Sequence, residues 1–225
     1  MRMRLLSHLT ARKGAETDFD SALRAEVSRM RSAASEAIEA IHCMIRLDND
    51  LFGACAPYRG TVEIQAGAAS QGEVQALASG LANRFGDLIH ADLSTALLGR
   101  DVVFIEPKRT AVRYQYLMRR NADFDHEAYL ERYASIHSQF GLKTPGIHGY
   151  VQLHLDLNAS KTAAERAGVG IWQVDSVSEL YLESVEAFMD AIGNLENDGG
   201  ARVDEEIFVD RACSHDFTSH VDWQD

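Results

Sequence analysis

A histidine on an aromatic helix face is the residue in this sequence best suited to chemistry. His137 falls in the last turn of a helix expected over residues 125–140, shortly before Gly141, a plausible helix stop. Tyr129 and Tyr133 share its side of the helix, which withdraws the ring from bulk water. Burial favours the neutral ring and the helix end favours imidazolium, so its pKa could suit proton transfer. These residues leave two interpretations of His137 open: a catalytic acid/base, or a core histidine bonded to one backbone carbonyl.

A row of polar residues follows on the next expected strand. Side chains alternate between the two faces of a strand, which places four polar residues on one face and aliphatic residues on the other. We expect the aliphatic face to lie under helices and the polar face to point into the interior of a closed barrel; exposure to solvent is the alternative. His148 and His154 would lie about 20 Å apart on an extended strand, so they cannot bind one metal ion together without other ligands. The predicted substrate-orienting residues are Tyr133, His148, Tyr150, Gln152 and His154.

No metal site, cofactor motif or nucleophile–base pair is predicted. Residues 213–225 contain a cysteine, two histidines and several acids, but their spacing fits no zinc pattern, so we expect a flexible or docking tail. Cys43, Cys55 and Cys213 lie far apart and are interpreted as reduced structural thiols. The sequence has neither a nucleotide-binding glycine fingerprint nor a Gly-x-Ser-x-Gly motif.

Composition narrows the class of protein. The chain has 225 residues and a formal net charge of −12, and it carries no Lys/Arg patch of the kind that a phosphate backbone requires. We therefore expect no nucleic-acid partner. The first ten residues lack an apolar run long enough for a signal peptide, and no stretch approaches the length of a membrane span. These features predict a soluble, cytoplasmic protein.

The elements that would position the polar residues occur twice, each time in the order βαββαβ. Both first helices begin with Asp-Phe-Asp; counting from it, Tyr133 and His137 correspond to Ser28 and Ser32, so only the second unit has the histidine. The first half is expected to contain strands Met3–Ala11, Ile41–Leu47, Thr61–Ala66 and Asp101–Ile105 and helices Asp18–Ala37 and Glu73–Ile89. The second is expected to contain strands Val112–Arg119, Tyr150–Leu155, Val169–Val174 and Glu205–Asp210 and helices Asp125–Phe140 and Val177–Leu195.

Two such units can complete each other. A βαββαβ unit has helices on only one face of its sheet, so the other face needs a partner. Two sheets facing each other would close an eight-stranded barrel with room for packed side chains or one small ligand. The link Lys108–Ala111 is too short for independently moving domains. We predict one α+β module made of repeats 1–107 and 112–212; two separate domains are the alternative.

The second half resembles a known family. A strand ending in Arg119 and Arg120, the Tyr133–His137 helix and a strand opening on Gly149-Tyr150 follow one another in the order typical of EthD proteins. The likeness continues in segments 168–172 and 204–210. The resemblance implies tandem ferredoxin-like repeats that form one α+β barrel. It also aligns the family's helix histidine with His137, which favours the interpretation of His137 as a catalytic acid/base. One departure is that the family's helix usually carries Trp near the position of Tyr133.

Three functions remain open at this point. The first is a cofactor-independent lyase, isomerase or monooxygenase that acts on a small apolar or aromatic molecule, with His137 as acid/base. The second, implied by related folds, is a haem-binding barrel with a histidine ligand. The third is a non-catalytic ligand-binding or structural protein. A small-molecule ligand is the expected partner in the first case, and a homodimer is left open in all three.

Overall fold

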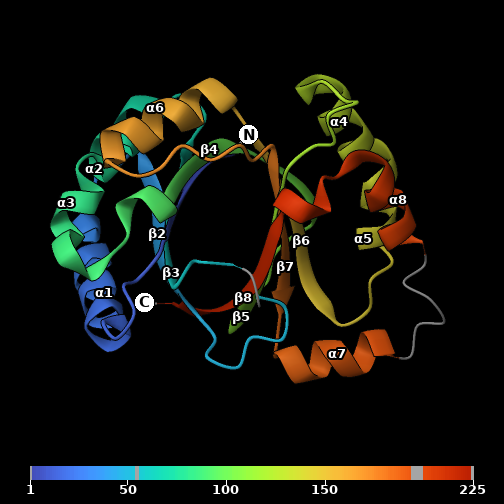
Figure 1. Ribbon diagram of the computed structural model, residues 1–225, viewed down its shortest axis with the longest axis horizontal. Helices are drawn as coiled ribbons and strands as arrows, with labels where there is room; N and C mark the ends of the chain where they lie inside the picture. The colour runs from blue at the N-terminus through green and yellow to red at the C-terminus, as the bar shows by residue number, and fades with distance from the viewer. Residues whose placement is uncertain (1, 54–55, 194–199, 224–225) are drawn as a thin grey trace.

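Eight antiparallel strands form a closed barrel with the helices outside it (Figure 1). The computed structural model describes residues 2–53, 56–193 and 200–223. The first repeat consists of β1 (Arg2–Leu9), α1 (Glu16–Ala33), β2 (Ile38–Arg46), β3 (Gly60–Gly67), α2 (Gln71–Ala78), α3 (Leu81–Phe85) and β4 (Thr95–Ile105). The second consists of β5 (Val112–Met118), α4 (His126–Arg132), η3 (Tyr133–His137), α5 (Ser138–Gly141), β6 (Ile147–Leu155), α6 (Leu157–Ala167), β7 (Ser176–Leu182), α7 (Val185–Gly193), α8 (Ala201–Phe208) and β8 (His215–Asp222).

The strand order confirms the prediction of two ferredoxin-like units in one α+β barrel. The first four strands are ordered β4-β1-β3-β2 and the last four β8-β5-β7-β6, which is the same order in each unit. The two sheets join at β2–β8 and at β4–β6, and both junctions are antiparallel. At the second junction Gly99 faces Leu155, and a Cβ at Gly99 would lie 2.2 Å from the carbonyl oxygen of His154. The absence of a side chain at Gly99 therefore permits the close approach of the two sheets.

Three elements of the second repeat differ from the sequence expectation. The third strand is β7, not residues 169–174, and the expected helix 177–195 is split between β7 and α7. The expected strand 205–210 begins inside α8, and the fourth strand is β8, which lies in the segment interpreted as a tail. Within β7, Val177, Glu179 and Tyr181 are buried on the inner face, so a charged residue interrupts the apolar alternation that marks a strand. The second repeat therefore extends to the end of β8.

An additional helix, α6, was not predicted, and it covers the first repeat rather than the second. It follows β6 directly, Asp156 caps its first turn, and it packs on β4 and α2 (Figure 1). Its small buried face joins the apolar layer between the first sheet and its helices, through Ala159, Ala163, Ala164 and Ala167. Because α6 belongs to the second repeat and packs on the first, it connects the two repeats into one structural unit.

The barrel interior is filled by side chains. At one end an apolar cluster includes Leu6, Leu97, Leu153 and Phe217. At the other, charged residues from five strands pair with one another: Arg4 contacts Glu179, Glu63 (3.2 Å) and Asp101 (2.6 Å), and Arg113 contacts Glu63. Burial alone would raise the pKa of Glu63, but Arg113 and Arg4 hold it well below its ordinary value. The lumen is thus a packed core containing a charge network.

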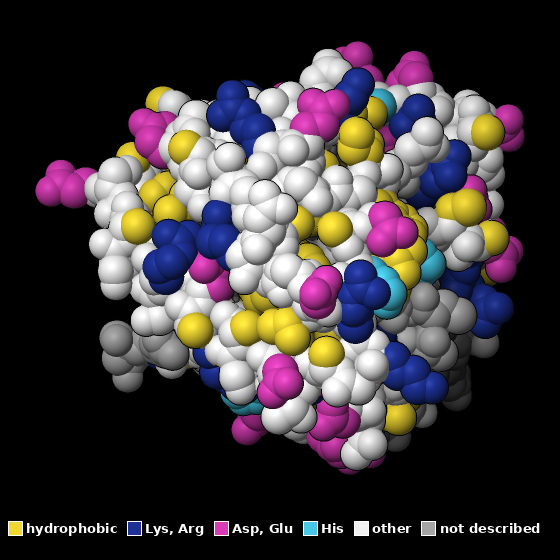
Figure 2. Space-filling view, turned by 60° about the vertical axis from the view of Figure 1, so that its left-hand side comes forward, with side chains coloured by type: hydrophobic (Ala, Val, Ile, Leu, Met, Phe, Trp, Pro, Cys, Tyr) yellow, Lys and Arg dark blue, Asp and Glu magenta, His cyan; other side chains and the backbone are white. Residues whose placement is uncertain are grey.

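The described helices include none that is both long and apolar enough to cross a membrane. On the face shown in Figure 2, Lys and Arg side chains are interspersed with Asp and Glu.

Candidate functional site

A pocket of about 440 Å³ lies outside the barrel, between the outer face of the second sheet and helices α5, α7 and α8. Strands β5, β7 and β8 supply its floor, and the helices and residue Phe52 of the first repeat supply the remaining wall. Most of the side chains lining it are aromatic or apolar. They include Phe52, Tyr114, Tyr116, Met118, Phe140, Tyr150, Leu180, Phe188 and Ile192. A ligand in this pocket would therefore be small and largely apolar.

His137 lies at the edge of this pocket and is only 9% exposed. Its Nδ1 atom is 3.0 Å from Oδ2 of Asp204 on α8, and Arg132 contacts the other oxygen of that carboxylate. Because an ionised carboxylate only accepts, Nδ1 carries the proton and Nε2 keeps its lone pair. Nε2 lies 3.8 Å from Oε1 of Glu205, which also lines the pocket. This is the arrangement of a histidine oriented by a carboxylate for proton transfer.

The pKa of His137 is lowered by burial, although Asp204 opposes that shift. The ring is packed against Phe208 at 5.2 Å and Tyr133 at 5.8 Å between ring centroids. The helix widens to a π-turn over Tyr133–His137, a local geometry that is frequent at functional sites. Asp125 caps the start of this helix through the Ala128 amide, as its sequence predicts. At neutral pH the imidazole is therefore mainly uncharged and able to accept a proton.

The sheet side of the pocket carries a second polar group that the sequence did not reveal. Asp216 of β8 accepts a hydrogen bond from the Tyr114 hydroxyl at 3.1 Å, and burial raises the pKa of Asp216. Asp216 was missed because it lies in the segment interpreted as a tail. Alternation of Phe217, Ser219 and Val221 on the inner face of β8 is the signal that could have found the strand.

The predicted polar row faces the helices and not the barrel lumen, so the expected orientation of β6 was wrong. Its aliphatic side fills the lumen, where Leu153 and Leu155 join the apolar cluster. Only Tyr150 of the row lines the 440 Å³ pocket. Gln152 is fully buried behind it and donates hydrogen bonds to the Tyr150 hydroxyl (2.7 Å) and to the Tyr133 carbonyl (3.1 Å). Residues of other strands form the charged network in the lumen. The polar residues of β6 make their hydrogen bonds on the helix side instead.

The other three predicted residues lie apart from the pocket. Tyr133 is fully buried and packs on His137 and His154, so it supports the histidine and does not line the cavity. His154 borders a different hollow, bonds Gln152 at 2.9 Å, and has a pKa lowered to about 4 by burial. The His148 side chain is 37% exposed and lies 4.0 Å from Glu183. Ser32, the first-repeat counterpart of His137, is exposed.

Two of the three cysteines and two histidines of the first repeat lie among the described residues. Cys43 is buried on β2, with a raised pKa caused by burial, and Cys213 is exposed; Cys55 lies outside the described residues. His8 lies in the lumen, where it contacts Thr61 at 2.8 Å, and His42 contacts Glu63 at 2.9 Å. Among the described residues, no group of three or more His, Cys, Asp or Glu side chains could hold a metal ion.

One segment that contributes to this site matches a known protein family. Residues 121–212 match the EthD domain. The matched segment contains His137, Asp204 and Tyr150, whereas Asp216 on β8 lies just beyond it. No curated protein matches the chain in sequence.

Solved structures with the same fold cover nearly the whole chain. An anthrone oxidase-like protein has a TM-score of 0.60 at 12% identity, over 98% of this chain and 90% of that one. A provisionally named monooxygenase from Lactobacillus acidophilus NCFM has a TM-score of 0.56 at 11% identity, over 99% and 94%. A chlorite dismutase variant from Candidatus Nitrospira defluvii, in complex with cyanide, has a TM-score of 0.56 at 11% identity, over 97% and 90%. These likenesses show a shared barrel fold, in which the EthD segment provides most of the second repeat.

Proposed function

We propose that the pocket beside His137 binds a small aromatic carbonyl compound or phenol, and that His137 removes a proton from it. The observation that carries this proposal is the His137–Asp204 contact at 3.0 Å at the edge of an aromatic pocket. A lowered histidine pKa keeps the base uncharged at neutral pH, and Asp204 stabilises the imidazolium that forms when the proton arrives. The pocket volume of about 440 Å³ suits a molecule of two or three fused rings.

The negative charge that develops on the substrate oxygen needs a donor, and Tyr150 can supply it. Its oxygen accepts a hydrogen bond from Gln152, and its own proton is therefore available for a substrate oxygen in the pocket. Burial raises the pKa of Tyr150 to about 12, which keeps the phenol protonated at neutral pH. Deprotonation of a carbon conjugated with an aromatic ketone would then give an oxyanion held by Tyr150 and an imidazolium held by Asp204.

Such a carbanion can react directly with dioxygen, which would make the protein a cofactor-independent oxygenase. For anthrone the sum is one anthrone and one dioxygen giving one anthraquinone and one water. The protein needs to supply only the proton abstraction and an aromatic pocket for this reaction. The anthrone oxidase-like name of one structural neighbour supports anthrone as the first probe.

The residues present do not favour haem in this pocket. A histidine ligand would have to offer Nε2 to the iron, but Oε1 of Glu205 lies 3.8 Å from that atom. The pocket also carries Asp216 on its opposite wall. We therefore derive no step through haem.

The test separates binding, proton transfer and oxygen chemistry. Anaerobic exchange of the anthrone C10 hydrogen for deuterium reports base catalysis, and an oxygen electrode reports turnover to anthraquinone. We expect His137→Ala to slow the exchange by about 10²- to 10⁴-fold, and Ser32→Ala, at the equivalent exposed position of the first repeat, to leave it unchanged. Circular dichroism establishes that both variants are folded.

Three other outcomes would each reject the proposal as stated. Equal exchange rates for wild type and His137→Ala would show that His137 is not the base and only packs in the core. Tight anthrone binding without exchange would identify a carrier. A Soret band on titration with haem that is lost in His137→Ala would identify a haem protein.

A further inference from the structure

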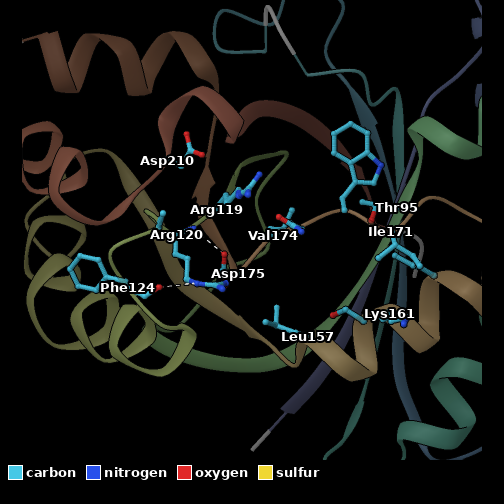
Figure 3. A pocket seen from close by; sticks show the side chains of 16 residues that line it. Thr95, Arg119, Arg120, Phe124, Leu157, Lys161, Ile171, Val174, Asp175 and Asp210 are labelled. Atoms are coloured by element: carbon cyan, nitrogen blue, oxygen red, sulfur yellow. Dashed lines mark hydrogen bonds and ion pairs between the residues drawn. The ribbon is translucent and has the colours of Figure 1, made fainter.

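A second pocket of about 480 Å³ opens at the end of the barrel and shares no lining residue with the His137 pocket. It is enclosed by α6, the start of β4, the loop that follows β5 and the segment before β7 (Figure 3). In Figure 3, Arg119 and Lys161 lie on opposite sides of it, and Thr95 lies near Ile171. Trp172 also lines the pocket. The function proposed above makes no use of this cavity.

The pocket carries an excess of positive charge in a chain whose formal charge is −12. Five charged residues line it: Arg119, Arg120, Lys161, Asp175 and Asp210. Arg120 is neutralised locally, because its guanidinium contacts Asp175 and its amide donates to the same carboxylate at 2.9 Å. The remaining charged residues are Arg119, Lys161 and Asp210, whose formal charges sum to +1. A ligand with one negative charge would neutralise the pocket.

One polar atom of the pocket has no protein partner. The Thr95 side chain is 1% exposed, and its hydroxyl makes no hydrogen bond to any described residue. A buried hydroxyl without a hydrogen-bond partner destabilises the folded state of the free protein. A ligand atom that bonds this hydroxyl would remove that cost.

The remaining walls are apolar, and part of them is left open to solvent. Ile171 is 56% exposed and Leu157 38% exposed, although both are large aliphatic residues. Trp172 and Phe124 add aromatic surface beside them. A flat hydrocarbon ring in the pocket would cover this surface, because apolar area removed from water is stabilising.

We propose that this pocket binds a small planar aromatic carboxylate. Arg119 binds the carboxylate, and Lys161 adds positive charge from the opposite wall. Trp172 and Ile171 cover the ring, and the Thr95 hydroxyl bonds a polar substituent. The site is separate from the proposed proton-transfer site, so either can be correct without the other.

Isothermal titration calorimetry with salicylate tests this assignment, and methyl salicylate serves as the uncharged probe. We expect salicylate to bind at least about tenfold more tightly than its ester, because charge-assisted hydrogen bonds to the carboxylate are lost in the ester. Arg119→Gln should weaken salicylate by at least about tenfold, whereas Arg12→Gln, at an exposed arginine outside the pocket, should have no effect.

Thr95→Val separates a ligand role from a structural one. Removing a hydroxyl without a protein partner should leave the melting temperature unchanged or higher, while salicylate affinity falls several-fold. Equal affinity for salicylate and its ester, equal affinity of Arg119→Gln and Arg12→Gln, or no saturable binding at millimolar salicylate would each overturn the proposal. Loss of salicylate binding in His137→Ala but not in Arg119→Gln would place the anion in the other pocket and overturn it too.

Discussion

The imidazole of His137 is bonded to the carboxylate of Asp204, 3.0 Å away in space and 67 positions away in sequence. Arg132, one turn before the histidine, contacts the other oxygen of the same carboxylate. The carboxylate thus raises the pKa of His137 against the larger effect of burial, whereas Arg132 lowers it in the same direction as burial. The two neighbours can be tested separately because they act in opposite directions.

Asp204→Asn should lower the pKa of His137 further, since it removes the negative charge that favours imidazolium. Arg132→Gln should raise it, because a nearby positive charge is lost. Histidine NMR titration measures both shifts. The anthrone exchange rate in Asp204→Asn should fall by about tenfold, less than the roughly 10²- to 10⁴-fold loss expected when the base itself is removed. Shifts of the same sign in the two variants would contradict this account of the site.

As pH falls, protonation of His8 in the unfolded chain should destabilise the protein at a higher pH than protonation of the carboxylates does. Burial lowers the pKa of His8 from 6.5 to about 3, so the folded state holds the neutral ring while the unfolded chain takes up a proton below about pH 6.5. Because the unfolded state then binds more protons, this contribution to stability is present above pH 6.5 and is lost progressively as pH falls toward 3.

Urea unfolding at pH 7.5 and 5.5 measures this effect. At about pH 5.5 His8 alone should reduce the free energy of unfolding by about 1 kcal/mol. The change between the two pH values should be smaller in His8→Gln by that amount, and unaltered in His220→Gln, because His220 has an exposed side chain. The same pH dependence in His8→Gln as in wild type would show that His8 is not responsible.

Glu63→Gln should destabilise the barrel strongly. Glu63 is fully buried and faces both Arg4 and Arg113, and removing one partner from a buried ion pair leaves an uncompensated charge. We expect a loss of about 3–5 kcal/mol in the free energy of unfolding. Glu183→Gln is the matched control, since the Glu183 side chain is 82% exposed, and it should change stability by less than about 0.5 kcal/mol. A loss below about 1 kcal/mol for Glu63→Gln would show that the network is not stabilising.

Gly99→Ala should damage the junction between the two repeats. The added Cβ would lie 2.2 Å from the backbone oxygen of His154, so a strand must move, at a cost of about 1–3 kcal/mol or more. Gly72→Ala provides the control: its Cβ would meet nothing within 4 Å, and Gly72 lies in α2, where alanine is favoured by about 0.5–1 kcal/mol. Thermal unfolding should move in opposite directions for the two variants. Similar melting temperatures would indicate that the β4–β6 junction is looser than described.

The spacing of apolar residues along the sequence was enough to predict the elements of the first repeat and the barrel architecture. Apolar residues such as Phe19, Leu23 and Val27 repeat at helical spacing and are buried in α1, because a helix face must cover a sheet. The repeated βαββαβ order, together with a short connection, was enough to predict two sheets that close on each other. His137 could be found too, since its aromatic neighbours on the helix are local in sequence.

Tertiary contacts decided the remaining features. Glu179 makes β7 a poor strand by alternation, yet it is stable there because Arg4 from the other repeat contacts it. The same lumen charges reverse the expected orientation of β6, which sends Tyr150 and Gln152 toward the helices. Asp204 contacts His137 from α8 and Asp216 lines the pocket from β8, and no local spacing links either residue to His137. The sequence by itself determined the repeat, the barrel and the histidine, whereas long-range charge pairing decided which face of each strand turns inward and which carboxylates face the site.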